Sequence, residues 1–273
     1  MRLRIAHSSV YRYDPPATGV IQVLRLTPRN HDGQYITDWR IDVTPDARLA
    51  ARDDAFGNIT HVFTADGPLD ELHVDVYGQV ETQSADGVVH GTVERFPQSL
   101  YLRDTALTEA DAPIRNFAQK IRATAGDDAL AVLHALLDRL HEDIRCEATT
   151  DDQSEREASS NAAKCFALKR GAPKDIAHIF IGAAHVLGIP ARCIGGYFCK
   201  PDMNGAQDTG HAWAEAYVPG LGWVAFDPAN GFCPTDAHVR VAVGLDYLGA
   251  APVRGTRLGA GAETLAIAIK VDQ

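Results

Sequence analysis

Residues 170–190 read RGAPKDIAHIFIGAAHVLGIP and contain the signals of one buried helix. Pro173 suits the first helical position, because its missing N–H would have no partner there and its φ is already helical. From Asp175 onward nearly every position is apolar, which predicts a helix buried on all sides. Gly188 and Pro190 then mark its C-terminal end. The stretch therefore predicts a buried helix that begins at Pro173 and stops just before Gly188.

Strand-like segments follow this helix, and amphipathic helices precede it. Alternating or apolar runs bounded by turn residues predict strands, and spacings of three and four predict helices. The expected strands are ARCIGGYF (191–198), HAWAEAYV (211–218), GWVAFDP (222–228) and TLAIAIKV (264–271), and the clearest helix is DDALAVLHALLDRLHEDI (127–144). A buried helix packed on antiparallel strands predicts an α+β fold.

Residues 1–95 have a different character. Breaks rich in Pro, Gly, Asn and Asp separate short alternating runs: RLRIAHSSVYRY (2–13), TGVIQVLRLTP (18–28), YITDWRIDVTP (35–45), NITHVFTA (58–65) and LHVDVYGQVET (72–82). Several strands at this spacing predict a β-sandwich-like region, in which we expect packing and turn residues but no site chemistry. The sequence thus predicts two domains, 1–95 and 96–273.

Composition excludes several classes of function. The net charge of −10 over 273 residues argues against a nucleic-acid partner, and no apolar run approaches the ~20 residues of a membrane span. The first residues, MRLRIAHSSVYRY, lack the apolar stretch of a signal peptide, so we expect a cytoplasmic protein. The five cysteines are odd in number and form no CxxC pair, which predicts reduced thiols and no structural zinc. We also expect no cofactor.

The candidate site combines the helix tip with two neighbouring strands. His211 begins one strand and Asp227 ends the next. The two side chains share a sheet face if the loop between the strands has an odd number of residues, as in the three-residue loop Pro219 to Leu221. A histidine and an acid beside a helix N-terminus form the framework of a thiol-dependent acyl-transfer site.

Several segments together resemble the bacterial transglutaminase-like superfamily. They are RGAPKDIAHIFIGAAHVLGIPARCIGGYF (170–198), GHAWAEAYVPGLGWVAFDPANG (210–231), HVRVAVGLDY (238–247) and APVRG (251–255), with LRLTPRNHDGQ (24–34) and DDAFGN (53–58) near the N-terminus. The resemblance implies a papain-like core preceded by a dedicated N-terminal β region. It also implies that His211 is the base and Asp227 the residue that orients it.

The resemblance places Pro173 where this family has its nucleophilic cysteine. The family pattern Gly-Val-Cys-Gln-Asp reads Gly-Ala-Pro-Lys-Asp at residues 171–175. Proline supplies no sulfur, a loss on the order of a millionfold in rate for such triads. It also supplies no backbone N–H for an oxyanion, and losing one such donor costs roughly 3–4 kcal/mol.

Other residues near the helix tip complete the predicted site. Lys174, Asp175 and Trp213 are expected to line the remaining cleft. Cys165 and Cys199 are candidate displaced nucleophiles, although neither lies at a helix N-terminus, where a thiolate would be stabilised.

The same helix also carries residue types that bind metals. Asp175 and His178 are three residues apart, His185 lies seven further on, and with His211 they form a conceivable ligand set. A buried, hydrogen-bonded His178 explains the same pattern, so we expect no metal.

Two functional hypotheses follow. In the first, the protein has lost the thiol mechanism and acts as a binding or scaffold module for a peptide or protein ligand that carries an amide. In the second, it is an active amide hydrolase or transferase that uses His211 and Asp227 with water or with Cys165 or Cys199.

Overall fold

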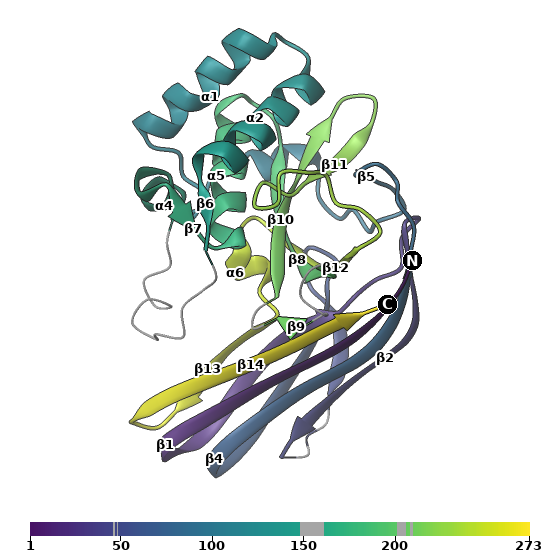
Figure 1. Cartoon of the computed structure of the whole chain (residues 1–273). Helices are drawn as coiled ribbons and strands as arrows, with labels where there is room; N and C mark the ends of the chain where they lie inside the picture. Colours follow the sequence, from purple (N-terminus) through teal and green to yellow (C-terminus); the bar gives the residue numbers. More distant parts are fainter. Residues whose placement is uncertain (46, 48, 148–160, 201–205, 208–209) are drawn as a thin grey trace.

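The computed structural model contains a long, curved antiparallel sheet and a smaller sheet covered by helices (Figure 1). It describes residues 1–45, 47, 49–147, 161–200, 206–207 and 210–273. In Figure 1 the long strands lie below and the helices above, with both chain termini at the same side of the molecule. Within the described residues, no helix combines the length and the apolar character that a membrane span requires.

The long sheet has seven strands, ordered β2-β4-β1-β14-β9, with β13 also paired to β1 and β3 to β4. All of the pairs are antiparallel. The strands are β1 (Arg2–Thr27), β2 (Gln34–Thr44), β3 (Ala50–Asp53), β4 (Ile59–Thr82), β9 (Ala206–Gln207), β13 (Val253–Leu258) and β14 (Ala262–Asp272).

Strands β1 and β4 are longer than the sequence predicts. Each joins two expected strands into one, with an irregular register between Arg12 and Gly19 of β1. The first part of β1 pairs with β14 and the second part with β13. Side chains from both parts, such as Tyr11 and Leu24, belong to one buried core. The sheet therefore curls around its own core, which is the sandwich-like arrangement that the sequence predicts.

The C-terminal strands belong to this sheet rather than to the helical region. β14 pairs with residues 4–14 of β1, so the two ends of the chain lie side by side. Conversely, the short strand β5 (Val88–Val89) pairs with a strand of the smaller sheet. A domain boundary between residues 95 and 96 would therefore place β13 and β14 in a different domain from β1, the strand with which they pair.

The smaller sheet has the order β12-β8-β10-β11-β5 and is covered by helices. Its main strands are β8 (Ala191–Phe198), β10 (His211–Val218), β11 (Gly222–Phe226) and β12 (His238–Gly244). The helices are η1 (Gln98–Leu102), α1 (Ala112–Ala125), α2 (Ala129–Asp143), α4 (Ala162–Leu168), α5 (Pro173–Val186) and α6 (Tyr247–Ala250). A parallel pair, β6 (Arg145–Cys146) and β7 (Arg170–Gly171), lies just before α5 in the fold.

Helix α5 is the predicted buried helix. Its residues 175–184 are all buried, and it packs on β8 and β10 as well as on α1, α2 and α4. Pro173 is at its start, and Gly188 follows its C-cap with a φ of 74°. The α+β class and the buried helix on an antiparallel sheet are therefore confirmed.

Close packing against α5 requires a glycine at position 182. A Cβ added there would lie 2.3 Å from the carbonyl oxygen of Thr108. Gly182→Ala should therefore lower the free energy of unfolding by about 1–3 kcal/mol through overpacking, although alanine is the better helix former. Urea unfolding measures this loss. The exposed Thr124→Ala on α1 should change the same quantity by no more than about 0.5 kcal/mol, and equal effects of the two substitutions would refute the packing argument.

Candidate active site

The N-terminus of α5 is capped from within the helix. The Oδ2 atom of Asp175 accepts a hydrogen bond from the backbone N–H of Ala172 at 3.1 Å. Asp175 is only 6% exposed, and burial raises the pKa of its carboxyl group. Asp175 thus fixes the backbone that enters the helix. It was expected to line the cleft, but its side chain does not line the cavity beside Pro173.

The hairpin of β10 and β11 brings His211 and Asp227 together. Val218 pairs with Gly222, which leaves a three-residue loop from Pro219 to Leu221. This is the odd loop length for which the sequence predicts a shared face. His211 Nε2 donates a hydrogen bond of 2.6 Å to Asp227 Oδ2.

Asp227 is a fully buried carboxylate with three side-chain partners. Besides His211, its Oδ2 atom contacts His238 Nε2 at 3.2 Å and accepts from Asn230 Nδ2 at 2.7 Å. Burial by itself would raise the pKa of Asp227, but the attraction and hydrogen bonds of His211 and His238 outweigh it, so the pKa is lowered. The carboxylate is therefore held in its ionised form.

His238 is a member of this site that the sequence analysis missed. The backbone N–H of Thr235 donates to its Nδ1 atom at 3.1 Å. A neutral imidazole that accepts at Nδ1 carries its proton on Nε2, which is the atom that faces Asp227. Burial lowers the pKa of His238 and keeps the ring neutral. His238 begins the predicted segment HVRVAVGLDY (238–247), but no neighbouring residue in the sequence indicates that it faces Asp227.

These three residues also form the group most suited to a metal among the described residues. The ligand atoms of His211, Asp227 and His238 all lie within 4.8 Å of one another. A metal at His238 Nε2 would need the lone pair of a nitrogen that the Thr235 contact leaves protonated. The donor set therefore fits a hydrogen-bonded network and does not fit a metal centre.

The conceivable metal set on α5 is dispersed. His178 Nε2 accepts from the N–H of Tyr247 at 3.0 Å. His185 Nδ1 contacts Asp104 at 2.8 Å and its Nε2 contacts the carbonyl oxygen of Ala191. Each histidine thus has its own local partner.

The predicted single cleft is divided among separate cavities. Pro173 and Lys174 line a cavity of about 250 Å³. His211 lines an adjoining one of about 20 Å³, and Trp213 lines a third of about 60 Å³ together with His238. Trp213 is 2% exposed and packs against the rings of both histidines. The expectation that Trp213 and Lys174 line one cleft is therefore wrong, because Trp213 belongs to the packed wall behind the imidazoles.

The long sheet contributes to the cavity beside Pro173. His7, Ser9 and Tyr11 of β1 line it opposite the start of α5. Residues 1–95 therefore supply cavity-lining polar side chains as well as packing and turn residues. The signal was a polar pair at inward-facing positions of an alternating strand, between Ile5 and Tyr11.

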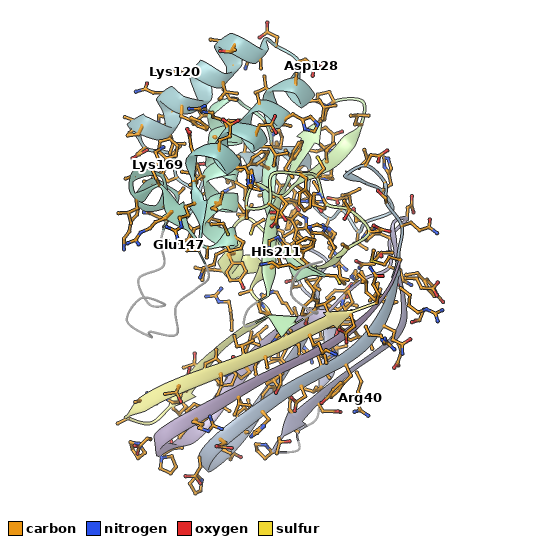
Figure 2. All side chains as sticks on the ribbon, in the orientation of Figure 1. Arg40, Lys120, Asp128, Glu147, Lys169 and His211 are labelled. Atoms are coloured by element: carbon orange, nitrogen blue, oxygen red, sulfur yellow. The ribbon has the colours of Figure 1, made fainter. Side chains whose placement is uncertain are left out.

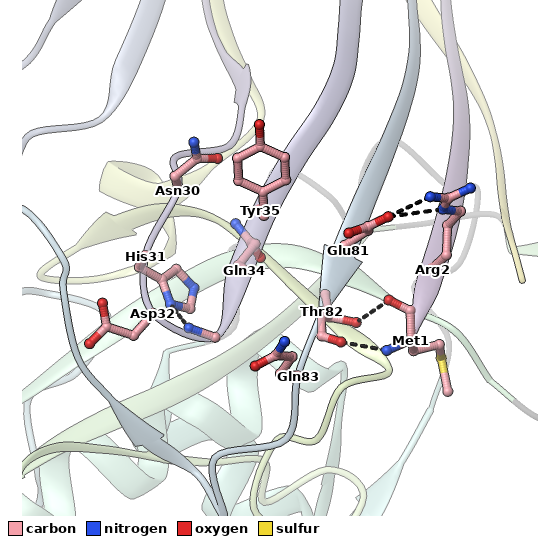
Figure 3. A pocket seen from close by; sticks show the side chains of 11 residues that line it. Met1, Arg2, Asn30, His31, Asp32, Gln34, Tyr35, Glu81, Thr82 and Gln83 are labelled. Atoms are coloured by element: carbon pink, nitrogen blue, oxygen red, sulfur yellow. Dashed lines mark hydrogen bonds and ion pairs between the residues drawn. The ribbon is translucent and has the colours of Figure 1, made fainter.

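The largest of the described cavities lies elsewhere. It measures about 680 Å³ and is bounded by residues 30–35, by residues 81–83 and by the start of β1 (Figure 3). Figure 3 shows Gln34, Tyr35 and Glu81 around it. It contains none of the residues predicted for the catalytic site, so size alone does not identify that site.

All five thiols lack the environment of a reactive cysteine. Burial raises the pKa of each of them, and nearby carboxylates add to the effect: Cys146, Cys165, Cys193, Cys199 and Cys233. The Cys165 pKa rises to about 12, and its Sγ donates to the carbonyl oxygen of Arg170 at 3.2 Å. Cys199 donates to the carbonyl oxygen of Val271 at 3.4 Å. A raised pKa disfavours the thiolate that attacks a carbonyl.

A buried ion-pair network supports the strand that carries His211. Glu215, on the same strand, is fully buried between Arg192 and Arg240, with N···O distances of 2.7 Å to each. Burial would raise the pKa of Glu215, but the two guanidinium groups outweigh it and lower the pKa to about 2. Arg192 also binds Glu94 through two hydrogen bonds.

Comparison with known proteins identifies the class of the fold. Residues 3–81 match the bacterial transglutaminase-like N-terminal region, and residues 115–228 match the transglutaminase-like superfamily. A candidate cysteine protease from Cytophaga hutchinsonii superposes with a TM-score of 0.79 at 18% identity, covering 100% of this chain and 90% of that one. At this identity the likeness shows the fold alone.

Two further proteins are similar to this chain. An uncharacterised protein of Mycobacterium leprae is 27% identical over 285 residues, covering 99% of this chain and 98% of the relative. The periplasmic domain of TgpA from Pseudomonas aeruginosa aligns with a TM-score of 0.41 at 14% identity, over 82% of this chain and 88% of that domain. Residues 3–81 and 115–228 of this chain thus carry the N-terminal region and the core of the transglutaminase-like superfamily.

The buried network gives a stability prediction. Glu215→Gln should lower the free energy of unfolding by about 3–5 kcal/mol, because it leaves buried guanidinium charge uncompensated. Denaturant unfolding monitored by circular dichroism measures this. Glu71→Gln removes a pair between exposed side chains and should cost far less. Similar losses in the two variants would contradict the assigned role of Glu215.

Buried His178 predicts an acid-sensitive stability. Burial lowers its pKa from 6.5 to about 4, so below pH 6.5 the unfolded chain binds a proton that the folded chain does not. The free energy of unfolding should therefore fall as the pH drops, by up to about 2 kcal/mol from His178 between pH 7 and 5. Urea titrations at both pH values should show a smaller drop for His178→Gln than for the wild type. Equal drops would exclude this contribution.

Proposed function

We propose that this protein is a transglutaminase-like binding or scaffold module that has lost the thiol mechanism of its family. Its ligand is a peptide or protein segment, held beside the N-terminus of α5, and its place of action is the cytoplasm. The observation that carries the proposal is Pro173 at the first position of that helix. In the family pattern this position holds the cysteine.

The chemistry of a proline at this position supports the proposal. An attacking group must form a covalent bond with the substrate carbonyl, and the pyrrolidine ring has no atom able to do so. The missing N–H also removes one donor that could stabilise the oxyanion. The substitution therefore removes two separate contributions to the reaction.

The state of the other thiols supports it further. A replacement nucleophile would need a lowered pKa and a nearby base, whereas the environments of Cys165 and Cys199 raise their pKa values. Both sulfur atoms already donate to backbone carbonyls. Neither is therefore prepared for attack.

The retained hydrogen bond between His211 and Asp227 favours a second candidate function. At 2.6 Å it is the contact that orients a base in a hydrolase or amide transferase. Among the described residues, however, no side chain donates to the Nδ1 atom of His211. A water molecule would have to serve as the nucleophile, and we rank this candidate second.

Restoring the cysteine tests the proposal. Pro173→Cys places a thiol at a helix N-terminus, where its pKa should be lowered. At pH 7 its alkylation by iodoacetamide should be about tenfold or more faster than that of any natural cysteine, measured by peptide mass spectrometry. Thr124→Cys is the matched control, since it adds a thiol at the exposed C-terminal end of α1.

The wild type provides the contrary result. If one natural cysteine were alkylated as fast as the cysteine introduced at position 173, and slowed in His211→Ala, the chain would retain an activated thiol. That outcome would favour the active-enzyme hypothesis and overturn the proposed loss of mechanism.

A further inference from the structure

The cavity at the tip of α5 is built from both parts of the molecule. On one side lie Pro173 and Lys174 at the start of the helix, and on the other lie His7 and Ser9 of β1. Figure 2 labels His211 between the helices and the long sheet. At about 250 Å³ the cavity is slightly smaller than the ~300–1,000 Å³ typical of pockets that enclose drug-sized ligands. It suits a single side chain or the end of a peptide.

A chain of hydrogen bonds ends at the wall of this cavity. The hydroxyl group of Tyr197 lies 3.0 Å from His7 Nδ1, and His7 Nε2 lies 3.0 Å from Ser9 Oγ. All three side chains are at least 96% buried, with exposures of 3%, 4% and 2%. Only Ser9 and His7 reach the cavity, while Tyr197 lies behind them on β8.

The partners determine the direction of these hydrogen bonds. Among the described residues, the Tyr197 hydroxyl has His7 as its hydrogen-bond partner, so its proton is donated to Nδ1. The imidazole proton then sits on Nε2 and is donated to Ser9 Oγ. Because Ser9 accepts from His7, its own O–H is directed elsewhere, and the open side of Ser9 is the cavity.

This direction holds at neutral pH. Burial lowers the pKa of His7 to about 4, and the smaller opposing effect of Asp75 does not restore it. A neutral His7 has one donor and one acceptor nitrogen, which are the two roles that its hydrogen bonds to Tyr197 and Ser9 require. His7 is thus not available as a base for Ser9, which argues against a serine nucleophile in this cavity.

Lys174 carries the charge of this cavity. Among the lining residues that the structure describes, it is the one with a charged side chain, since His7 is neutral. Its Nζ lies 5.3 Å from the ring centre of Tyr247, and no carboxylate of the described residues lies within ion-pair distance of it. The other lining groups are largely apolar and include Val253, Leu265 and Ile267.

We propose that this cavity binds a carboxylate group attached to an apolar body, such as the C-terminus of a peptide that ends in an aliphatic residue. Ser9 O–H and the Lys174 ammonium donate to the carboxylate, and the apolar wall receives the side chain. An amide in the same place would keep one acceptor oxygen, set its NH2 against one of the two donors and lose the charge that attracts Lys174, which disfavours it. The inference rests on the proposed binding function and names the group that is recognised.

Calorimetric titration of the full chain with three peptides tests this. The probes are acetyl-Ala-Ala-Leu with a free C-terminus, the same peptide as its C-terminal amide, and an amidated acetyl-Ala-Ala-Glu. The free acid should bind about tenfold or more tightly than its amide, because charge-assisted hydrogen bonds are roughly twice as strong as neutral ones. Binding of the glutamate peptide would identify a side-chain carboxylate as an alternative source of the same group.

Variants separate the assigned donors from general packing. Lys174→Gln should remove most of the preference for acid over amide, whereas Lys120→Gln, on the exposed face of α1, should leave it unchanged. Ser9→Ala should reduce the preference and Ser9→Thr should retain it. Tyr197→Phe should act like Ser9→Ala although Tyr197 does not line the cavity, since Ser9 could then donate to His7. Circular dichroism and unfolding curves check that each variant is folded.

Equal affinity for acid and amide, or no binding of any of the three peptides, would overturn the inference. So would an unchanged preference in Lys174→Gln. These outcomes leave the proposed loss of the thiol mechanism untouched, because that claim depends on cysteine reactivity. Alkylation-sensitive turnover would contradict the proposed function whichever peptide binds.

Discussion

One buried negative charge organises the centre of this molecule. The carboxylate of Asp227 is shielded from solvent and accepts from His211, His238 and Asn230. An isolated charge at that depth would be costly, so these donors are a condition of the fold. They connect the ends of three strands, β10, β11 and β12, and they keep both imidazoles in fixed orientations. The hydrogen bonds that join His211 to Asp227 are therefore also a structural support. Under the proposed function, this is why they persist without a nucleophile.

The helix tip is independent of this support. Proline at the first position of α5 leaves the helix, its Asp175 cap and its packing intact, because that position needs no N–H. Under the proposed function, loss of the attacking group thus carries little structural cost. What remains beside the tip is a cavity shared with β1, on which Lys174 and the Ser9 hydroxyl face an apolar wall. Such a surface agrees with the proposed role in recognition.

Local sequence patterns predict a large part of this arrangement. The apolar run after Pro173 identifies α5, and the Pro219–Leu221 loop fixes the register that joins His211 to Asp227. Both depend on neighbours in sequence, where periodicity and turn chemistry are informative. The resemblance to the family added the expected roles of these residues, which no spacing could supply.

Local sequence patterns do not predict contacts between segments that are distant in sequence. His238 meets Asp227 only through the path of β12, and Ser9 meets the tip of α5 only because the long sheet packs beside the core. The joining of paired short runs into β1 and β4 was missed because proline and glycine breaks normally end strands. Here the chain crosses the breaks with a change of register and continues in the same sheet.

The central claim concerns chemistry at one helix tip, and a turnover assay addresses it most directly. Purified wild-type protein is incubated with a glutamine-containing peptide and a primary amine, and ammonia release and cross-linked product are measured before and after treatment with iodoacetamide. The account predicts no turnover above the uncatalysed background in either sample. Turnover in the untreated protein that disappears on alkylation would contradict it.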